Sequence, residues 1–264
     1  MECVIALVTH SSYIDICNNF VSLFRANWPD CPFKLVGAVI GEDKIVEGIE
    51  TVYVENGDKL TDCICRVKEL YPADFYLCFL GDAFISSKVD HEKVVSLLNE
   101  LKQKEAQYCR LFPMREKNRA TDSDLARQIK YSDVYGHSFV AFLTTPKFID
   151  ENLHGKTDLE FEKKYLEMTS DSELTEIFND DYVVTRDIFH IIPTVVKGKW
   201  DRVALKQVRR QNPDIRFSSR EYLSICEQTR LILINALEGF IPGSLRGKIK
   251  KLLSHMGFKF STQS

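Results

Sequence analysis

The feature that most constrains this chain is a run of six apolar residues at positions 75–80, FYLCFL, which stops at Gly81 and Asp82. A run of this length is too short to span a membrane. Because it lacks polar alternation, it is typical of a strand buried on both faces of an α/β sheet. Ligands bind just beyond the carboxyl ends of such strands. Asp82 would lie at such an end, which makes its carboxylate a candidate ligand of a divalent cation that bridges to a diphosphate. A turn or helix-cap residue after a strand is the alternative.

Strand-like and helix-like patterns alternate over the first 112 residues. Short apolar runs predict further strands at residues 3–8, 33–40, 49–54 and 108–112. Apolar residues at helical spacing predict helices around residues 13–28, 60–67 and 94–101. This alternation predicts an α/β fold with a mixed, mostly parallel sheet flanked by helices.

The second half of the chain is more varied. Residues 114–130 are rich in charged and hydroxyl side chains and predict an exposed loop, in the position of a lid over a site. We expect a strand at residues 138–143, a short helix at 172–178 and a basic helix at 201–210. A long helix is expected at residues 221–240, and it begins a helical C-terminal extension.

Size and composition allow one large α/β domain with an extension. The chain has 264 residues, 44% of them hydrophobic, and a net charge of −3, so it lacks the basic footprint of a nucleic-acid-binding protein. The eight cysteines are scattered without a Cys-x-x-Cys pair, which argues against zinc. Free thiols, no recognisable signal peptide and no membrane span predict a cytoplasmic protein.

Two polar segments besides Asp82 carry candidate chemistry. Thr9 and His10 follow the first strand, where small polar side chains and helix N-terminal amides can meet a nucleotide; plain helix capping by Ser12 and Asp15 is the alternative. Lys197 and Lys199 flank a glycine before Trp200 and could neutralise a leaving diphosphate, or simply end a strand.

Two carboxylates and one histidine complete the candidates. Glu160 and Glu162 stand on either side of Phe161, and one of them could act as a general base, although the local pattern by itself favours a solvated helix face. His190, between Phe189 and Ile191, is by its local pattern more typical of a structural histidine than of a ligand.

The C-terminal end is basic and amphipathic. Leu245, Ile249, Leu252, Leu253 and Met256 form one apolar stripe. No acidic residue follows Pro242, and lysines and one arginine lie mostly on the other side of the stripe. This pattern predicts a helix that can bind an anionic membrane surface, with a packed helix bearing a solvated basic face as the alternative.

Several motifs, taken in order, resemble bacterial GT-A-type glycosyltransferases of capsule, exopolysaccharide and lipopolysaccharide biosynthesis. The motifs are a helix ending in Trp28-Pro29-Asp30-Cys31-Pro32, the strand end Leu80-Gly81-Asp82-Ala83-Phe84, Tyr108-Cys109-Arg110-Leu111, Leu159-Glu160-Phe161-Glu162 and Val196-Lys197-Gly198-Lys199-Trp200. The resemblance spans roughly residues 3–210. It implies a GT-A-like (Rossmann-like) fold with a nucleotide-sugar half at about 1–113 and an acceptor half at about 131–215, followed by the helical extension at 216–264.

The resemblance also implies roles for individual residues. Thr9 and His10 would lie at the nucleotide, Lys197 and Lys199 near the phosphates, and Glu162 or Glu160 would be the base. Asp82 would bind the diphosphate and a divalent cation, Mn²⁺ or Mg²⁺, with His190 as an additional ligand. The family often has a Glu-Asp pair where this chain has Gly81 and Asp82, so the metal has one carboxylate fewer.

The sequence therefore predicts a glycosyltransferase that moves a sugar from a nucleotide-sugar donor, a UDP-sugar in the first instance, to a lipid-linked or oligosaccharide acceptor. We expect it in the cytoplasm, with its basic end on the inner face of the membrane. The alternative is a non-catalytic scaffold of the same pathway that binds a nucleotide or glycan. A nucleotidyltransferase shares the sheet type, but the glycine-rich phosphate loop expected after its first strand is missing.

Overall fold

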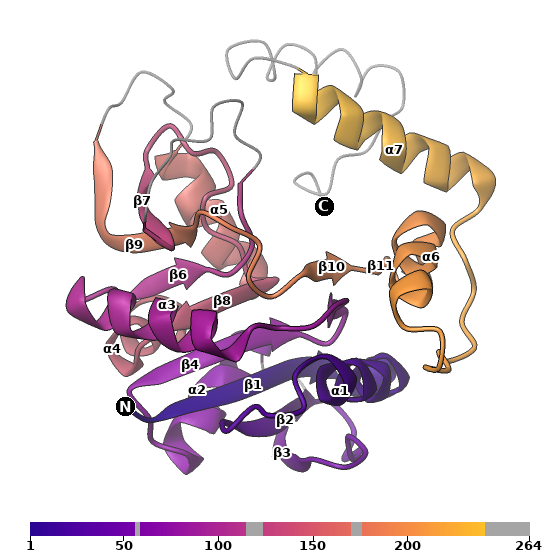
Figure 1. The fold of residues 1–264 in the computed structure, drawn as a ribbon, viewed down its shortest axis with the longest axis horizontal. Coiled ribbons are helices and arrows are strands. Elements are labelled where there is room, and N and C mark those ends of the chain that lie inside the picture. The colour runs from indigo at the N-terminus through magenta and orange to yellow at the C-terminus, as the bar shows by residue number, and fades with distance from the viewer. Residues whose placement is uncertain (56–58, 115–123, 170–175, 241–264) are drawn as a thin grey trace.

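The fold is built around one eight-stranded sheet, seen in the computed structural model in Figure 1, which describes all residues except 56–58, 115–123, 170–175 and 241–264. The strands, in their order across the sheet, are β3 (Glu50–Val54), β2 (Lys34–Ile40), β1 (Cys3–His10), β4 (Phe75–Leu80), β8 (Ala141–Thr144), β6 (Tyr108–Arg110), β9 (Ile177–Val184) and β7 (Ala126–Lys130). The apolar run at positions 75–80 is thus a central strand, as predicted.

Strand direction divides the sheet into two halves. The neighbours β3, β2, β1 and β4 are all parallel, whereas β8 runs antiparallel to both β4 and β6, and β7 runs antiparallel to β9. The expected fold class, a mixed and mostly parallel sheet flanked by helices, is confirmed.

Helices cover both faces of the sheet. One face packs against α1 (Ile14–Asn27) and α3 (His91–Gln103), and the other against α2 (Leu60–Leu70), α4 (Pro146–Phe148) and α5 (Asp158–Met168). A 3₁₀ turn, η1 (Ser11–Tyr13), precedes α1, and a π-helical turn, η2 (Ile149–Leu153), follows α4. Burial on both faces explains why the central strands lack polar alternation.

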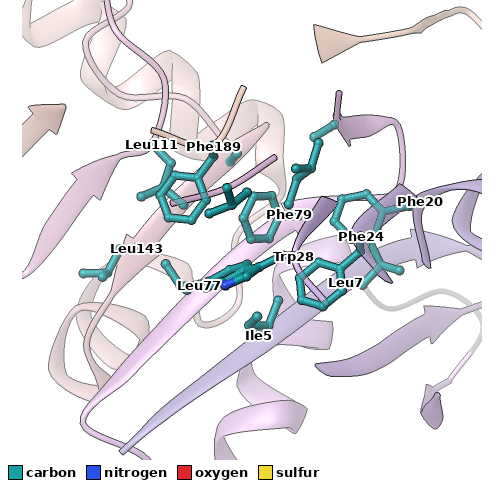
Figure 2. Close-up of a cluster of buried hydrophobic side chains, with 14 of the residues drawn as sticks. Ile5, Leu7, Phe20, Phe24, Trp28, Leu77, Phe79, Leu111, Leu143 and Phe189 are labelled. Carbon is teal, nitrogen blue, oxygen red and sulfur yellow. The ribbon is translucent and has the colours of Figure 1, made fainter. Parts of the chain in front are cut away.

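The core under α1 is aromatic (Figure 2). Phe20 and Trp28, one face of the helix, lie against Phe79 of β4 and Phe189, with ring centroids 5.6 Å apart for Phe20 and Phe79 and 6.0 Å for Trp28 and Phe189. All four side chains are almost fully buried. The helical spacing of aromatic residues in positions 13–28 therefore fixes α1 on the sheet.

Two short two-stranded sheets bring the later chain back to the end of β4. The strand β5 (Ala83–Ile85) pairs with β10 (Ile191–Pro193), and β11 (Val195–Val196) pairs with β12 (Lys199–Trp200) as a hairpin. Figure 1 shows β10 and β11 leading from the sheet towards the C-terminal helices. The lysine hairpin expected from the sequence thus lies near Asp82.

The C-terminal part contains α6 (Arg202–Gln211) and α7 (Ile225–Phe240). These confirm the two helices expected there, although α7 starts four residues later than the apolar pattern indicated. No helix in the described part of the chain is both long and apolar enough to cross a membrane. The expected membrane-binding stripe, from Leu245 to Met256, lies outside the described residues.

Two sequence predictions on the second half were wrong. The expected polar loop at residues 114–130 ends in a strand, because β7 pairs with β9 at the edge of the sheet and needs only one buried face. The short helix expected at residues 172–178 is also wrong where the chain is described, since β9 begins at Ile177. In both cases pairing with a distant strand overrides the local pattern.

Candidate functional site

The carboxyl ends of β1 and β4 lie side by side. The Gly81 N–H donates to the carbonyl of Val8 at 3.1 Å. A Cβ atom on Gly81 would come within 2.5 Å of the Cys17 Sγ on α1 and 3.3 Å of the Thr9 Oγ1. Contacts as short as the first do not occur in folded proteins, so glycine is required for α1 to pack on this strand end. The missing acidic residue at position 81 therefore has a structural cause.

The end of β1 presents His10 but not Thr9. Thr9 is only 4% exposed, and its hydroxyl donates to the carbonyl of His10 at 3.2 Å. His10 is exposed, and its Nδ1 accepts the N–H of Ser12 at 3.1 Å. Because a backbone N–H can only donate, the neutral imidazole carries its proton on Nε2. His10 thus keeps one donor for a ligand.

Capping at the start of α1 differs from the sequence prediction. Ser12 and Asp15 were expected to form a capping box, but His10 caps the η1 turn instead, and α1 begins after Tyr13 without a side-chain cap. That prediction was wrong because a 3₁₀ turn precedes the helix and shifts its first residue.

Asp82 sits in the turn between β4 and β5. Its carbonyl accepts two bonds from Thr194, from N at 3.2 Å and from Oγ1 at 3.4 Å. Burial raises the pKa of the Asp82 carboxyl to about 6. Within the described part of the chain, no lysine, arginine or histidine forms an ion pair with it. A sparsely solvated carboxylate of this kind can bind a cation or accept a hydrogen bond from a ligand hydroxyl.

The structure does not bring His190 to Asp82. Pro193 pairs with Ala83 next to Asp82, whereas the carbonyl of His190 accepts bonds from Ser86 at the other end of the β5–β10 ladder. Four residues of extended chain separate the two ends by about 13 Å. Instead, the His190 Nδ1 lies 3.5 Å from a carboxylate oxygen of Asp187. Among the residues that the structure describes, no group of three or more His, Cys, Asp and Glu could hold a metal.

The two lysines of the β11–β12 hairpin differ in their surroundings. Lys197 and Gly198 have φ angles of 51° and 78°, as a two-residue type I′ turn requires. Lys197 is exposed, whereas the Lys199 Nζ lies 3.8 Å from Glu221 and 3.7 Å from Glu227. The charge of Lys199 is therefore already balanced, and Lys197 has the more available charge.

Arg220 ties three segments of the site together, and sequence reasoning missed it. Its guanidinium makes a bidentate pair with Asp15 at 2.7 and 2.6 Å and also donates to the carbonyls of Ser12 and Gly198. The guanidinium also lies over the ring of Tyr13. The loop after β1, the start of α1 and the lysine hairpin are thereby joined. No local pattern could reveal this, because Asp15 is 205 residues away.

A cavity of about 360 Å³ opens beside this loop, lined by Gly41, Asp43, Tyr53, Val54 and Glu55 at the carboxyl ends of β2 and β3. A Cβ on Gly41 would lie 3.2 Å from the His10 Nε2, so the cavity adjoins the imidazole. Tyr53 is 37% exposed. An exposed aromatic ring between two carboxylates can stack on a base and accept bonds from ribose hydroxyls.

The two glutamates of α5 have separate surroundings. The Glu160 carboxylate closes a capping box with Thr157, accepting its N–H at 2.7 Å. Glu162 is instead half-buried, and its Oε1 accepts the Phe139 N–H at 2.8 Å and the Ser138 hydroxyl at 3.4 Å. Burial raises the pKa of Glu162. Of the two, Glu162 has the geometry of a general base.

Glu162 and Asp82 belong to one edge of the sheet. The N–H of Phe139 donates to Glu162. The carbonyl of the next residue, Val140, accepts the N–H of Leu80 at 2.9 Å, and Leu80 is two residues before Asp82. The strand β8 runs antiparallel to β4, so its start lies where β4 ends. The structure therefore brings Asp82, His10, Lys197 and Glu162 to the same edge, and leaves His190 and Glu160 apart from them.

No protein-family model and no curated protein matches this chain. Among solved structures it is similar to S. aureus TarS, with 13% identity over 99% of this chain and 44% of that one, and a TM-score of 0.48. A cytidylyltransferase from Leptospira borgpetersenii serovar Hardjo-bovis gives 11% identity over 84% and 100% of the two chains, with a TM-score of 0.43. A CMP:2-keto-3-deoxy-manno-octonic acid synthetase complexed with CTP gives 12% over 80% and 98%, with a TM-score of 0.44. This chain spans less than half of the full TarS structure, and TM-scores below 0.5 decide nothing about function.

Proposed function

We propose that this chain is a glycosyltransferase that moves a sugar from a nucleotide-sugar donor to a hydroxyl of a glycan acceptor. The observation that carries the proposal is that a half-buried carboxylate, Asp82, and a hydrogen-bonded glutamate, Glu162, lie at the same edge of the sheet. A cavity of nucleotide-base size adjoins that edge. Burial on both faces of the central strands keeps these groups in a fixed relative position.

The donor would lie along the ends of β3, β2, β1 and β4. Its base would enter the cavity beside Tyr53, with the ribose near Asp43 and Glu55. Its diphosphate would reach the His10 Nε2 proton and the exposed Lys197. These donors stabilise the negative charge that builds on the leaving diphosphate. Thr9 contributes packing rather than a side-chain contact, since its hydroxyl is buried.

Glu162 would perform the proton transfer. Its carboxylate takes the proton from the acceptor hydroxyl while that oxygen forms a bond to the anomeric carbon of the sugar. The bond between the anomeric carbon and the diphosphate breaks, and the electron pair leaves with the nucleoside diphosphate. A pKa raised by burial makes Glu162 a stronger base than an exposed glutamate. The bonds from Phe139 and Ser138 orient its Oε1 and leave Oε2 for the acceptor.

A divalent cation would be held by Asp82. Mg²⁺ is commonly bound by one or two carboxylates together with substrate phosphates and water, so a single carboxylate suffices for a site that the donor completes. When bound, the cation would neutralise charge on the diphosphate. His190 lies too far along the β5–β10 ladder to share it.

A non-catalytic scaffold remains the alternative function. Gly81 in place of an acidic residue is the sequence feature that favours it, but the packing of Gly81 against Cys17 gives that glycine a structural reason. For the acceptor we propose a lipid-linked glycan of surface polysaccharide synthesis, met in the cytoplasm at the inner face of the membrane.

The test is turnover of UDP-, GDP- and CMP-sugars by the full chain, with Mg²⁺, Mn²⁺ or EDTA, followed as release of the nucleotide. The proposal expects slow release from at least one donor, accelerated by lipid-linked acceptors and lost in Glu162→Gln while donor binding persists. Donor binding without turnover under all these conditions would favour the scaffold. No binding of any donor would overturn the proposal.

A further inference from the structure

The segment Tyr108-Cys109-Arg110-Leu111 has no role in the proposed reaction, yet Arg110 ends at the same edge of the sheet. Arg110 is the last residue of β6, and β6 lies two strands from β4. Its Nε donates to the carbonyl of Phe112 at 3.1 Å and its Nη1 to the carbonyl of Tyr135. The guanidinium also lies 3.9 Å from the centroid of the Phe112 ring. Three contacts thus fix its plane.

Arg110 differs from Arg127 and Arg220 in lacking a hydrogen-bonded carboxylate partner. Arg127 pairs with Asp133 at 2.7 Å, and Arg220 pairs with Asp15 at 2.6 Å. Among the residues that the structure describes, no carboxylate forms an ion pair with Arg110 and no acceptor meets its Nη2, although Glu162 and Asp133 lie near enough to act on its pKa. A largely buried cation is unfavourable unless an anion balances it. Arginine keeps its charge even when burial lowers its pKa, as here.

Arg110 and Glu162 approach the same loop. Tyr108, two residues before Arg110 and on the same face of the sheet, exchanges hydrogen bonds with the backbone of Ser138 at 2.9 and 2.8 Å. Glu162 binds the hydroxyl of that serine and the N–H of Phe139, while Arg110 binds Tyr135. The free Nη2 of Arg110 and the free Oε2 of Glu162 therefore both border the loop at residues 135–139.

The register sets the distance from the donor side. Arg110 and Cys78 both pair with Phe142 of the intervening strand, so they are level across the sheet. Two strand spacings separate them by about 10 Å. Asp82, on the donor side, lies four residues beyond Cys78, a further 13 Å at about 3.3 Å per residue. An acceptor of about three sugar rings that contacts Arg110 can therefore place a hydroxyl between Glu162 and the donor.

We propose that Arg110 binds an anionic group, a carboxylate or a phosphate, on the acceptor. This inference rests on the proposed function and adds the chemical class of its acceptor: an acidic or phosphorylated glycan. The planar guanidinium suits either oxyanion. The Phe112 ring lies against the guanidinium, and Tyr135, whose carbonyl Arg110 binds, is 38% exposed, so both offer aromatic surface to a sugar ring.

The test uses three probes with the full chain: glucuronate for a carboxylate, glucose 6-phosphate for a phosphate, and glucose as the neutral control. Affinities are measured by saturation-transfer NMR at constant ionic strength. At least one anionic probe should bind tenfold or more tightly than glucose. Arg110→Gln should lower that affinity to the level of glucose. The same change at the exposed Arg66 of α2, Arg66→Gln, should leave it unaltered.

A second measurement removes any dependence on how well Arg110→Gln folds. In the unmutated chain labelled with ¹⁵N-arginine, the Arg110 side-chain resonance, assigned from Arg110→Lys, should shift with the anionic probe and not with glucose. An unmoved resonance, no preference for an anion, or a preference that survives in Arg110→Gln would each overturn the inference.

Donor binding is followed in parallel, so that the two proposals fail separately. Turnover of a nucleotide sugar without any anion effect at Arg110 would leave the glycosyltransferase and reject this acceptor class. An anion effect at Arg110 without binding of any nucleotide sugar would support the anion site and reject glycosyl transfer.

Discussion

The two halves of the sheet hold their functional groups in different ways. In the parallel half, β3 to β4, these groups lie on turns directly after strands, and backbone packing positions them, as Gly81 against Cys17 shows. In the mixed half, β8 to β7, they are side chains from α5 and β6 that meet on the loop at residues 135–139. A strand end is predictable from local pattern, whereas a loop shared by distant elements is not.

The carboxylates of the two halves show the same contrast. Burial raises the pKa of both Asp82 and Glu162, but Glu162 accepts two hydrogen bonds from Ser138 and Phe139. Asp82 has no such donors from other described residues. Under the proposed function, Glu162 would exchange a proton and Asp82 would receive a cation from outside the protein.

The largest expected effect is on Glu162 of the mixed half. Glu162→Gln keeps the shape of the side chain but cannot take a proton, so kcat for sugar transfer should fall by roughly 10²- to 10⁴-fold while donor affinity stays within twofold. Glu160→Gln is the matched control two residues away, because glutamine can still close the capping box there. It should lower kcat less than threefold. Steady-state kinetics on both variants distinguish the roles, and equal losses would reject Glu162 as the base.

A smaller effect is expected at Arg220, which joins the segments of the parallel half. Arg220→Gln removes the bidentate pair with Asp15, so donor affinity should drop about tenfold and unfolding should become easier by roughly 1–3 kcal/mol. Calorimetric titration with the donor and urea denaturation measure the two losses. Arg216→Gln, an exposed arginine of the same segment, is the control. Unaltered donor affinity in Arg220→Gln would show that donor binding does not depend on the ion pair between Arg220 and Asp15.

The smallest change concerns the packing of Gly81. Gly81→Ala would place its Cβ against the Cys17 Sγ and should destabilise the fold by about 1–3 kcal/mol. In the double variant Gly81→Ala, Cys17→Ala the clash is gone, and at least 1 kcal/mol of that loss should return. Denaturation of the four members of this cycle gives the coupling. Additive losses would mean that Gly81 is not held by Cys17.

The fold could be predicted from the sequence where burial leaves a local signature. The apolar runs at positions 3–8 and 75–80 identified the central strands, and aromatic spacing identified α1. The strand β7 was missed because its sequence, ARQIK, has only two apolar residues and pairs with a single neighbour. The short strand β5 was missed because only its pairing with β10 orders it.

The site could be predicted only where a residue follows a strand directly. Asp82, His10 and Lys197 lie at the edge indicated by the sequence, and their roles stay predictions. His190 was grouped with Asp82, because the sequence does not reveal at which end of a ladder a residue lies. Arg110 and Arg220 received no role, since only tertiary contacts show which of them has a counter-ion and which does not.

The most direct test of the account is the stability and donor binding of Asp82→Asn at two pH values. A folded-state pKa of about 6 lies above the unfolded value of about 3.9, so the wild-type fold loses stability as the pH rises from 4 to 6. Asp82→Asn does not titrate. It should therefore match the wild type at pH 4, exceed it by roughly 2 kcal/mol at pH 8, and lose Mg²⁺-dependent donor binding. A variant that is less stable at pH 8 and binds the donor as before would contradict the account.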